Sequence, residues 1–278
     1  MTAGINRGIE RACREGLVRS ATLMAAGAAF DDAVAVAQRT PALSVGCHVV
    51  LTGGEPVLPP AQLASLASGG QFRAGIAAFA QAAIFGKLNA NEIRAEVEAQ
   101  IHKLQRAGRA LTHVDTHKHT HLFPAVLRPL LEAARDCGIR AVRNPFTPVR
   151  LLATQLLRGN FTRSSKVMML AFFRASFGRE LRRSGMRAPD GSFGIIATGS
   201  LNAATLARIA AAIPEGTWEL VTHPGYNDAE LERLPTRLRQ SRDLELALLC
   251  SPETRHEFER QRVEIISYLE FLESSAVR

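Results

Sequence analysis

Four of the eight histidines of the chain lie within residues 113–121. Four side chains in this stretch recur at every second position: Asp115, His117, His119 and His121. An extended backbone would place them on one face, where imidazole nitrogens and a carboxylate can bind a divalent cation. The cluster follows an apolar run that contains Leu111 and Val114, and Pro124 opens the next helical pattern. We therefore predict that it ends a buried strand, where α/β enzymes place their chemistry, and is not a polar loop.

Two further histidines end apolar segments elsewhere in the chain. His48 lies in the run 43–51, and His223 ends the run 218–223 before a Pro-Gly turn. Taken alone, His48 would be interpreted as a buried core histidine. Because the carboxyl ends of parallel strands meet at one edge, His48, His117 and His223 are expected to converge. Their convergence favours a metal-assisted active site over unconnected histidines.

The elements that must position these residues alternate along the chain. Apolar residues at helical spacing predict helices at residues 3–15, 28–38, 91–107, 125–136, 201–212, 239–250 and 253–262. Apolar runs predict strands at residues 17–25, 43–51, 139–143, 193–200, 218–223 and 263–268, besides the one that ends at the histidine cluster. Residues 61–90 lack clear periodicity and predict an irregular excursion near the site.

This alternation predicts an α/β fold with a parallel sheet. About seven strand–helix units favour a distorted (β/α) barrel over a Rossmann sheet, with residues 1–278 forming a single domain. No GxGxxG or Walker motif indicates a nucleotide. The chain opens on a helix, so the strand expected first in a barrel is missing.

Composition is ordinary for a soluble enzyme, with 46% hydrophobic and 6% aromatic residues. The four cysteines show no paired spacing, which argues against a disulfide framework or a cysteine zinc site and favours a reducing cytoplasm. No apolar run approaches the ~18 residues of a membrane-spanning helix, and no signal peptide is evident.

The net charge of +8 comes from one segment. Residues 150–187 hold nine Lys or Arg and one Glu, and nine minus one equals the charge of the whole chain. This basic helical insertion is expected to cover the barrel, or alternatively to lie on an anionic membrane surface, with the protein peripheral to the inner membrane. Nucleic acid is not expected, because the aromatic residues of the segment sit in apolar company.

Several motifs together resemble those of the YdjC-type carbohydrate deacetylases, which include ChbG-like and hopanoid-associated branches. The matching segments start at Asn6 (NRGI), Gly46 (GCHVVLT), His113 (HVDTHKHTHLFP), Gly138 (GIRAVR), Thr198 (TGSL), Glu219 (ELVTHPGY) and Arg242 (RDLEL). The resemblance covers nearly the whole chain outside residues 61–90 and 150–187, and its two histidine motifs are the specific ones.

The resemblance implies a distorted βα-barrel hydrolase that removes an N-acetyl group from an amino sugar, in an oligosaccharide or a glycolipid, with one Mg²⁺ or Zn²⁺ ion. In that family an aspartate and two histidines hold the metal, and the two histidines correspond here to His48 and His117. His223 would act as general acid. A Lewis acid that polarises the amide and a proton donor for the departing amine suit this reaction.

The remaining motif residues have supporting roles under the same resemblance. Arg143 would steady a carboxylate or the substrate in catalysis. Asp115, His119 and His121 are expected to orient the metal ligands or to bind sugar hydroxyls.

The chain departs from the family at its start. The family's Asp-Asp-Phe-Gly motif precedes the first helix, and Asp31-Asp32 cannot replace it because the pair opens the second helix and is followed by Ala-Val. We expect either that the coding region starts upstream of Met1, with roughly 10–20 more residues, or that this chain is inactive.

Two other functions compete with deacetylation. One is a catalytically silent carbohydrate- or lipid-binding barrel that keeps the histidines without the base. The other is a metal-dependent phosphoesterase, which would need more carboxylates near the cluster than Asp115. A homodimer is compatible with the sequence.

The membrane alternative can be tested with vesicles. If residues 150–187 lie on anionic lipid, the protein should co-sediment with phosphatidylserine-containing vesicles at low salt and be released as ionic strength rises, because screening weakens the attraction of the basic residues. Neutral phosphatidylcholine vesicles are the control. Absence of salt-sensitive binding would leave only the covering role.

Overall fold

A four-stranded parallel sheet forms the centre of the computed structural model, which describes residues 1–148 and 173–274. Its strands lie in the order β1 (Ser20–Leu23), β2 (Ser44–Val49), β5 (His113–Thr116) and β6 (Ala141–Val142). A second parallel pair consists of β7 (Gly191–Phe193) and β8 (Trp218–Leu220). A parallel bridge between Ala141 and Arg187 links the chain leading into β7 with β6. Within these two sheets, each strand is thus parallel to its neighbours.

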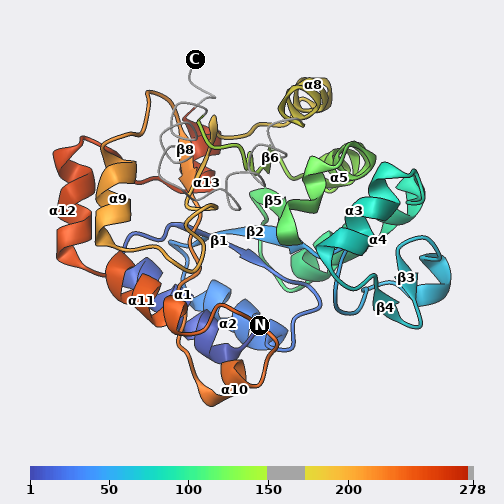
Figure 1. Ribbon diagram of the computed structural model, residues 1–278, viewed down its shortest axis with the longest axis horizontal. Helices are drawn as coiled ribbons and strands as arrows, with labels where there is room; N and C mark the ends of the chain where they lie inside the picture. Colours follow the sequence, from blue (N-terminus) through green and yellow to red (C-terminus); the bar gives the residue numbers. More distant parts are fainter. Residues whose placement is uncertain (149–172, 275–278) are drawn as a thin grey trace.

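Helices surround the sheet (Figure 1). In that view α1 (Ala3–Arg14), α2 (Phe30–Arg39) and α11 (Gln240–Leu249) gather below β1 and β2, and α3 (Ile76–Ile84), α4 (Ala90–Arg106) and α5 (Pro124–Asp136) lie to one side. The others are α8 (Arg174–Ser184), α9 (Ala203–Ala210), α10 (Ala229–Glu232), α12 (Pro252–Arg260) and α13 (Tyr268–Glu273). No helix in the described ranges is long and apolar enough to cross a membrane.

The α4 helix shows how the local sequence sets its structure. The Asn89 side chain caps the helix by accepting a hydrogen bond from the amide of Asn91. The apolar side chains that recur at helical spacing are buried in the main core, and Gly108 follows the helix with φ of 88°. All seven predicted helices are present as α1, α2, α4, α5, α9, α11 and α12, within a few residues of their expected bounds.

The predicted barrel is not confirmed, because the sheet is open in the part of the chain that the structure describes. Among the described strands, β1 pairs with β2 alone and β8 pairs with β7 alone. A cavity of about 540 Å³ separates β1 from β8, lined on one side by residues 17–20 and on the other by residues 217–220. The fold is therefore α/β with a parallel sheet, as predicted, but without closure.

Three local predictions are wrong. Residues 263–268 form no strand, because Ser267 caps α13 through a capping box with Glu270 and Tyr268 enters the helix. The strand expected at 193–200 lies instead at Gly191–Phe193, and Gly194 then turns the chain with φ of 87°. Residues 61–90 are not irregular throughout, since they contain α3 and a hairpin of β3 (Ala67–Ser68) and β4 (Gln71–Phe72).

The basic insertion is described only from residue 173 onward. There α8 packs against α5, and Phe177 is buried against Phe146, with ring centroids 5.5 Å apart. Residues 150–172 of the insertion lie outside the described residues.

A buried amide holds the loop that follows β2. Gln100 Nε2 donates to the carbonyl of Val50 at 2.7 Å, and the Val50 amide donates to Gln100 Oε1 at 2.9 Å. Gln100 Nε2 also donates to Glu96, whose carboxylate accepts the amides of Val57 and Leu58. Because His48 lies two residues before Val50, this network fixes the backbone beyond the histidine.

Replacing this amide should destabilise the fold. Gln100→Leu leaves the buried N–H and C=O of Val50 without their partner, at a cost of about 1–3 kcal/mol each, or roughly 2–6 kcal/mol of unfolding free energy in total. Urea denaturation measures the change. Gln81→Leu, on the exposed side of α3, is the control and should stay close to wild type. Equal losses in the two variants would contradict the role of Gln100.

Candidate active site

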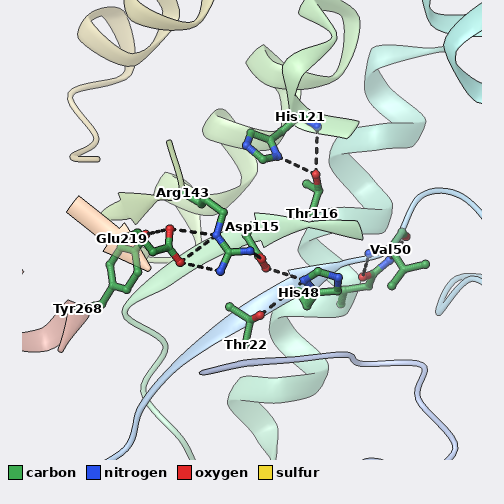
Figure 2. A network of polar contacts seen from close by, with 10 residues as sticks. Thr22, His48, Val50, Asp115, Thr116, His121, Arg143, Glu219 and Tyr268 are labelled. Carbon is green, nitrogen blue, oxygen red and sulfur yellow. Dashed lines mark hydrogen bonds and ion pairs between the residues drawn. The ribbon is translucent and has the colours of Figure 1, made fainter. Parts of the chain in front are cut away.

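Strands β2 and β5 bring a histidine and an aspartate side by side. The strands pair in parallel with His48 opposite Asp115, so the two side chains leave the same face of the sheet. His48 Nδ1 lies 2.8 Å from Asp115 Oδ1, and the Thr22 hydroxyl of β1 lies 3.5 Å from the same nitrogen (Figure 2). The carboxylate thus fixes the orientation of the His48 ring.

Asp115 is completely buried, and both of its oxygens have partners. Oδ1 faces His48, and Oδ2 accepts a hydrogen bond from Arg143 Nη1. Burial by itself would raise the pKa of this carboxyl, but the charge of Arg143 and the contact with His48 lower it well below its usual range. Asp115 therefore stays ionised, and its place behind His48 suits it to orient the imidazole rather than to activate water.

Arg143 follows β6 and joins two carboxylates. Besides Asp115 it contacts Glu219 of β8, with Nε 2.9 Å from Oε1 and Nη2 2.6 Å from the same oxygen. The Tyr268 hydroxyl donates to Glu219 Oε2 at 2.8 Å. Burial opposes the charge of Arg143, but Asp115 and Glu219 raise its pKa further, so the guanidinium stays charged. The structure thus places Arg143 against Asp115, and its part in catalysis stays a prediction.

The histidine cluster does not continue as a strand, so the prediction of one shared face is wrong. β5 ends at Thr116, and the next six residues form the 3₁₀ segment η2 (His117–Leu122). Lys118 and His119 have φ of 55° and 54°, a left-handed conformation that costs non-glycine residues of order 1–3 kcal/mol each. In an extended strand, every second side chain would point to the same face. The left-handed turn removes this alternation.

His117 is brought next to His48 by this turn. The two ring centroids lie 5.7 Å apart with the planes inclined at 75°. Burial, followed by the neighbouring His48 and Lys118, lowers the pKa of His117 to about 4. At neutral pH its imidazole is uncharged and can offer a lone pair.

The other two histidines of the cluster point into the protein. The Nδ1 atom of His121 lies 2.7 Å from the Thr116 hydroxyl, and His121 is fully buried. The rings of His119 and His121 lie 6.2 Å apart, and burial lowers their pKa values to about 3 and about 4. That His119 and His121 orient the metal ligands or bind sugar hydroxyls stays a prediction.

His223 is held by its backbone. Its amide donates to Glu245 Oε2 at 2.6 Å, and its carbonyl accepts from Arg242 Nη1 at 3.3 Å. The loop lies against α1, where a Cβ at Gly8 would stand 2.5 Å from the Cα of Gly225. Burial, and then the charges of Arg242 and Arg143, lower the pKa of the His223 imidazole to about 3. Its Nδ1 is buried and accepts or donates no hydrogen bond within the described part of the chain.

Two residues of the predicted set fit part of a metal site. Across residues 1–148 and 173–274, no three His, Cys, Asp or Glu side chains are arranged to hold a metal ion. His48 and His117 nevertheless suit two positions around one divalent cation, since metal–nitrogen bonds of about 2 Å allow neighbouring rings at this separation. The contact of His48 Nδ1 with a carboxylate is usual for a metal-binding imidazole and leaves Nε2 for the ion.

Sequence reasoning missed Glu219, Tyr268 and Glu245 as parts of the site. Glu219 stands four residues before His223 in the same apolar run, and a charged residue within that run was the available signal. Tyr268 was placed in an expected strand, so nothing indicated its contact with Glu219. Asp32, which was set aside as a substitute base, accepts a hydrogen bond from Asn6 at 2.8 Å and connects α2 to α1.

A parallel α/β fold with a carboxylate-oriented histidine at the strand ends is typical of the α/β enzymes that carry their sites at that edge. The chain belongs to the YdjC-like family, whose model matches residues 1–260. This confirms the resemblance found in the sequence.

Relatives support the family assignment, and a solved structure shares the fold. A carbohydrate deacetylase of Brevibacillus brevis is 31% identical over 269 residues, 96% of this chain and 94% of that protein. One from Mus musculus is 32% identical over 242 residues, 80% of this chain and 73% of its own. A chitooligosaccharide deacetylase of Enterobacter sp. is 36% identical over 140 residues, 50% and 53% of the two chains.

The solved structure is that of an Enterococcus faecalis protein named for cellobiose-phosphate cleavage. It superimposes with a TM-score of 0.76 at 22% identity and covers 97% of this chain and 94% of its own. At this identity the similarity is one of fold.

The pairing of His48 with His117 makes metal affinity the first test. Replacing both by Ala should lower Zn²⁺ affinity by more than the ~10–100-fold that loss of an orienting partner costs, because both donor nitrogens are removed. Titration calorimetry and metal content of the purified protein measure this. His256→Ala, exposed on α12, is the control. Equal metal binding by the double variant and wild type would refute the assignment.

Proposed function

We propose that this protein removes the acetyl group from the nitrogen of an amino sugar, in an N-acetylglucosamine-containing oligosaccharide or glycolipid. The observation that carries the proposal is the His48–Asp115 pair facing His117 at the strand ends. Relatives in the family are named carbohydrate deacetylases or chitooligosaccharide deacetylases.

One divalent ion, Mg²⁺ or Zn²⁺, would be held by His48 and His117. When bound, it would polarise the acetyl carbonyl and lower the pKa of a water molecule. The chain's own contribution is to present both imidazoles in the ligating form. Asp115 keeps the Nδ1 side of His48 occupied, and burial keeps His117 neutral at pH 7.

His223 would move the proton in this reaction. With a pKa of about 3 its imidazole is neutral at pH 7, so it cannot begin as a proton donor. We propose that it takes a proton from the attacking water and delivers it to the amine nitrogen as the C–N bond breaks. The products are acetate and the free amino sugar. The backbone contacts to Glu245 and Arg242 hold the ring in place during both transfers.

The cellular location of the protein is inferred from its cysteines. We propose a cytoplasmic location, since the cysteines Cys13, Cys47, Cys137 and Cys250 are all free in the structure. Association with an anionic membrane through residues 150–187 and a homodimer stay hypotheses.

Removing the His223 imidazole should separate chemistry from metal binding. His223→Ala should bind Zn²⁺ as wild type does and lose ~10²–10⁴-fold in acetate release from di-N-acetylchitobiose, the usual contribution of general acid–base catalysis. An enzyme-coupled acetate assay with several metals measures turnover, and His102→Ala on α4 is the matched control. Undiminished turnover in His223→Ala would exclude this role.

A further inference from the structure

Glu219 and Tyr268 form the outer half of a continuous polar chain that ends at His48. It runs from the Tyr268 hydroxyl to Glu219, through Arg143 to Asp115, and on to His48 (Figure 2). We propose that Glu219 and Tyr268 are positioning residues, which hold the Arg143 guanidinium so that Asp115 keeps its second oxygen for His48. This inference rests on the proposed function, in which His48 binds the metal.

The contact between Arg143 and Glu219 divides the guanidinium between two carboxylates. Nε lies 2.9 Å and 3.0 Å from the two oxygens of Glu219, and Nη2 lies 2.6 Å from Oε1. Only Nη1 is directed to Asp115. Without Glu219, Arg143 would be free to pair with both oxygens of Asp115, the preferred bidentate geometry of a guanidinium. The guanidinium would then compete with His48 for Oδ1 of Asp115.

Tyr268 holds the carboxylate of Glu219, which in turn holds the guanidinium of Arg143. Its hydroxyl lies 2.8 Å from Glu219 Oε2, and burial and then the charge of Glu219 raise the pKa of the phenol, so it remains a donor. Its backbone amide donates to the Ser20 hydroxyl of β1 at 2.9 Å. The C-terminal helix α13 thereby reaches the site from the far end of the sequence.

A stacked histidine keeps the Tyr268 ring in place. The rings of His113 and Tyr268 lie 3.7 Å apart and are parallel within 4°. Gly46 provides the space, because a Cβ there would lie 2.7 Å from the His113 ring. Burial lowers the pKa of His113 to about 3, so an uncharged ring stacks on the phenol at pH 7. Three strands thus hold the tyrosine: β8 through Glu219, β1 through Ser20 and β5 through His113.

Two substitutions test the chain of contacts with little change in volume. Tyr268→Phe keeps the stack on His113 and removes only the hydroxyl, and Glu219→Gln keeps the shape and removes the charge. Zn²⁺ affinity, measured by calorimetry on the full chain, should fall ~10-fold for Tyr268→Phe and up to ~100-fold for Glu219→Gln, the range for residues that orient metal ligands. In ¹⁵N NMR the His48 ring, protonated at Nδ1 in the wild type, should become a mixture of tautomers.

Glu270→Gln is the control, because it weakens the capping box of the same helix without touching Glu219. It should lower the melting temperature and leave Zn²⁺ affinity and the His48 tautomer unchanged. If Glu219→Gln or Tyr268→Phe leaves Zn²⁺ affinity and the His48 tautomer unchanged, as this control does, the positioning role is wrong. If Glu219→Gln does not fold, the result for Tyr268→Phe alone decides whether the role is right. Failure of wild type to release acetate, with the tautomer and affinity changes present, would refute the proposed function alone.

Discussion

The site depends on the pairing of one buried carboxylate. Asp115 has no exposed surface, and an ionised carboxylate there is tolerated only because Arg143 and His48 contact its two oxygens. Removing Arg143 would leave the buried carboxylate without its cationic partner, which typically costs about 3–5 kcal/mol. The short strand β6 and the contacts of β8 and α13 therefore matter less for their own burial than for bringing Arg143 and its supports to this point.

Much of the fold could be predicted from local patterns, because the buried face of a helix is visible in the sequence as apolar residues at helical spacing. The α4 helix was evident from the spacing of its apolar residues, and its Asn cap and terminal glycine confirmed both ends. Sheet closure is a non-local property, and the edges of β1 and β8 carry no sequence signal of what pairs with them. Residues 263–268 show the same limit: their apolar content predicted a strand, but the capping box at Ser267 determined a helix instead.

The site was predictable where chemistry and strand ends coincide. His48 and His117 were identified because each follows an apolar run, and the structure places their rings side by side. The period-two pattern of His119 and His121 failed because the backbone becomes left-handed at residues 118 and 119. No glycine in the sequence signals that turn. Glu219 and Tyr268 are separated by 49 positions and meet only through tertiary contact, which no spacing in the sequence encodes.

The charges of the buried side chains in this network do not cancel. Asp115 and Glu219 carry two negative charges, and Arg143 supplies one positive charge, so the group as a whole carries one net negative charge. The side chains of Arg143 and Glu219 are only 13% and 12% exposed, which leaves water little room to screen that charge. Under the proposed function, a divalent cation on the free nitrogen of His48 would compensate this charge. The two buried carboxylates would therefore strengthen the binding of a cation to this imidazole, because the attraction between opposite charges is strong where water is excluded.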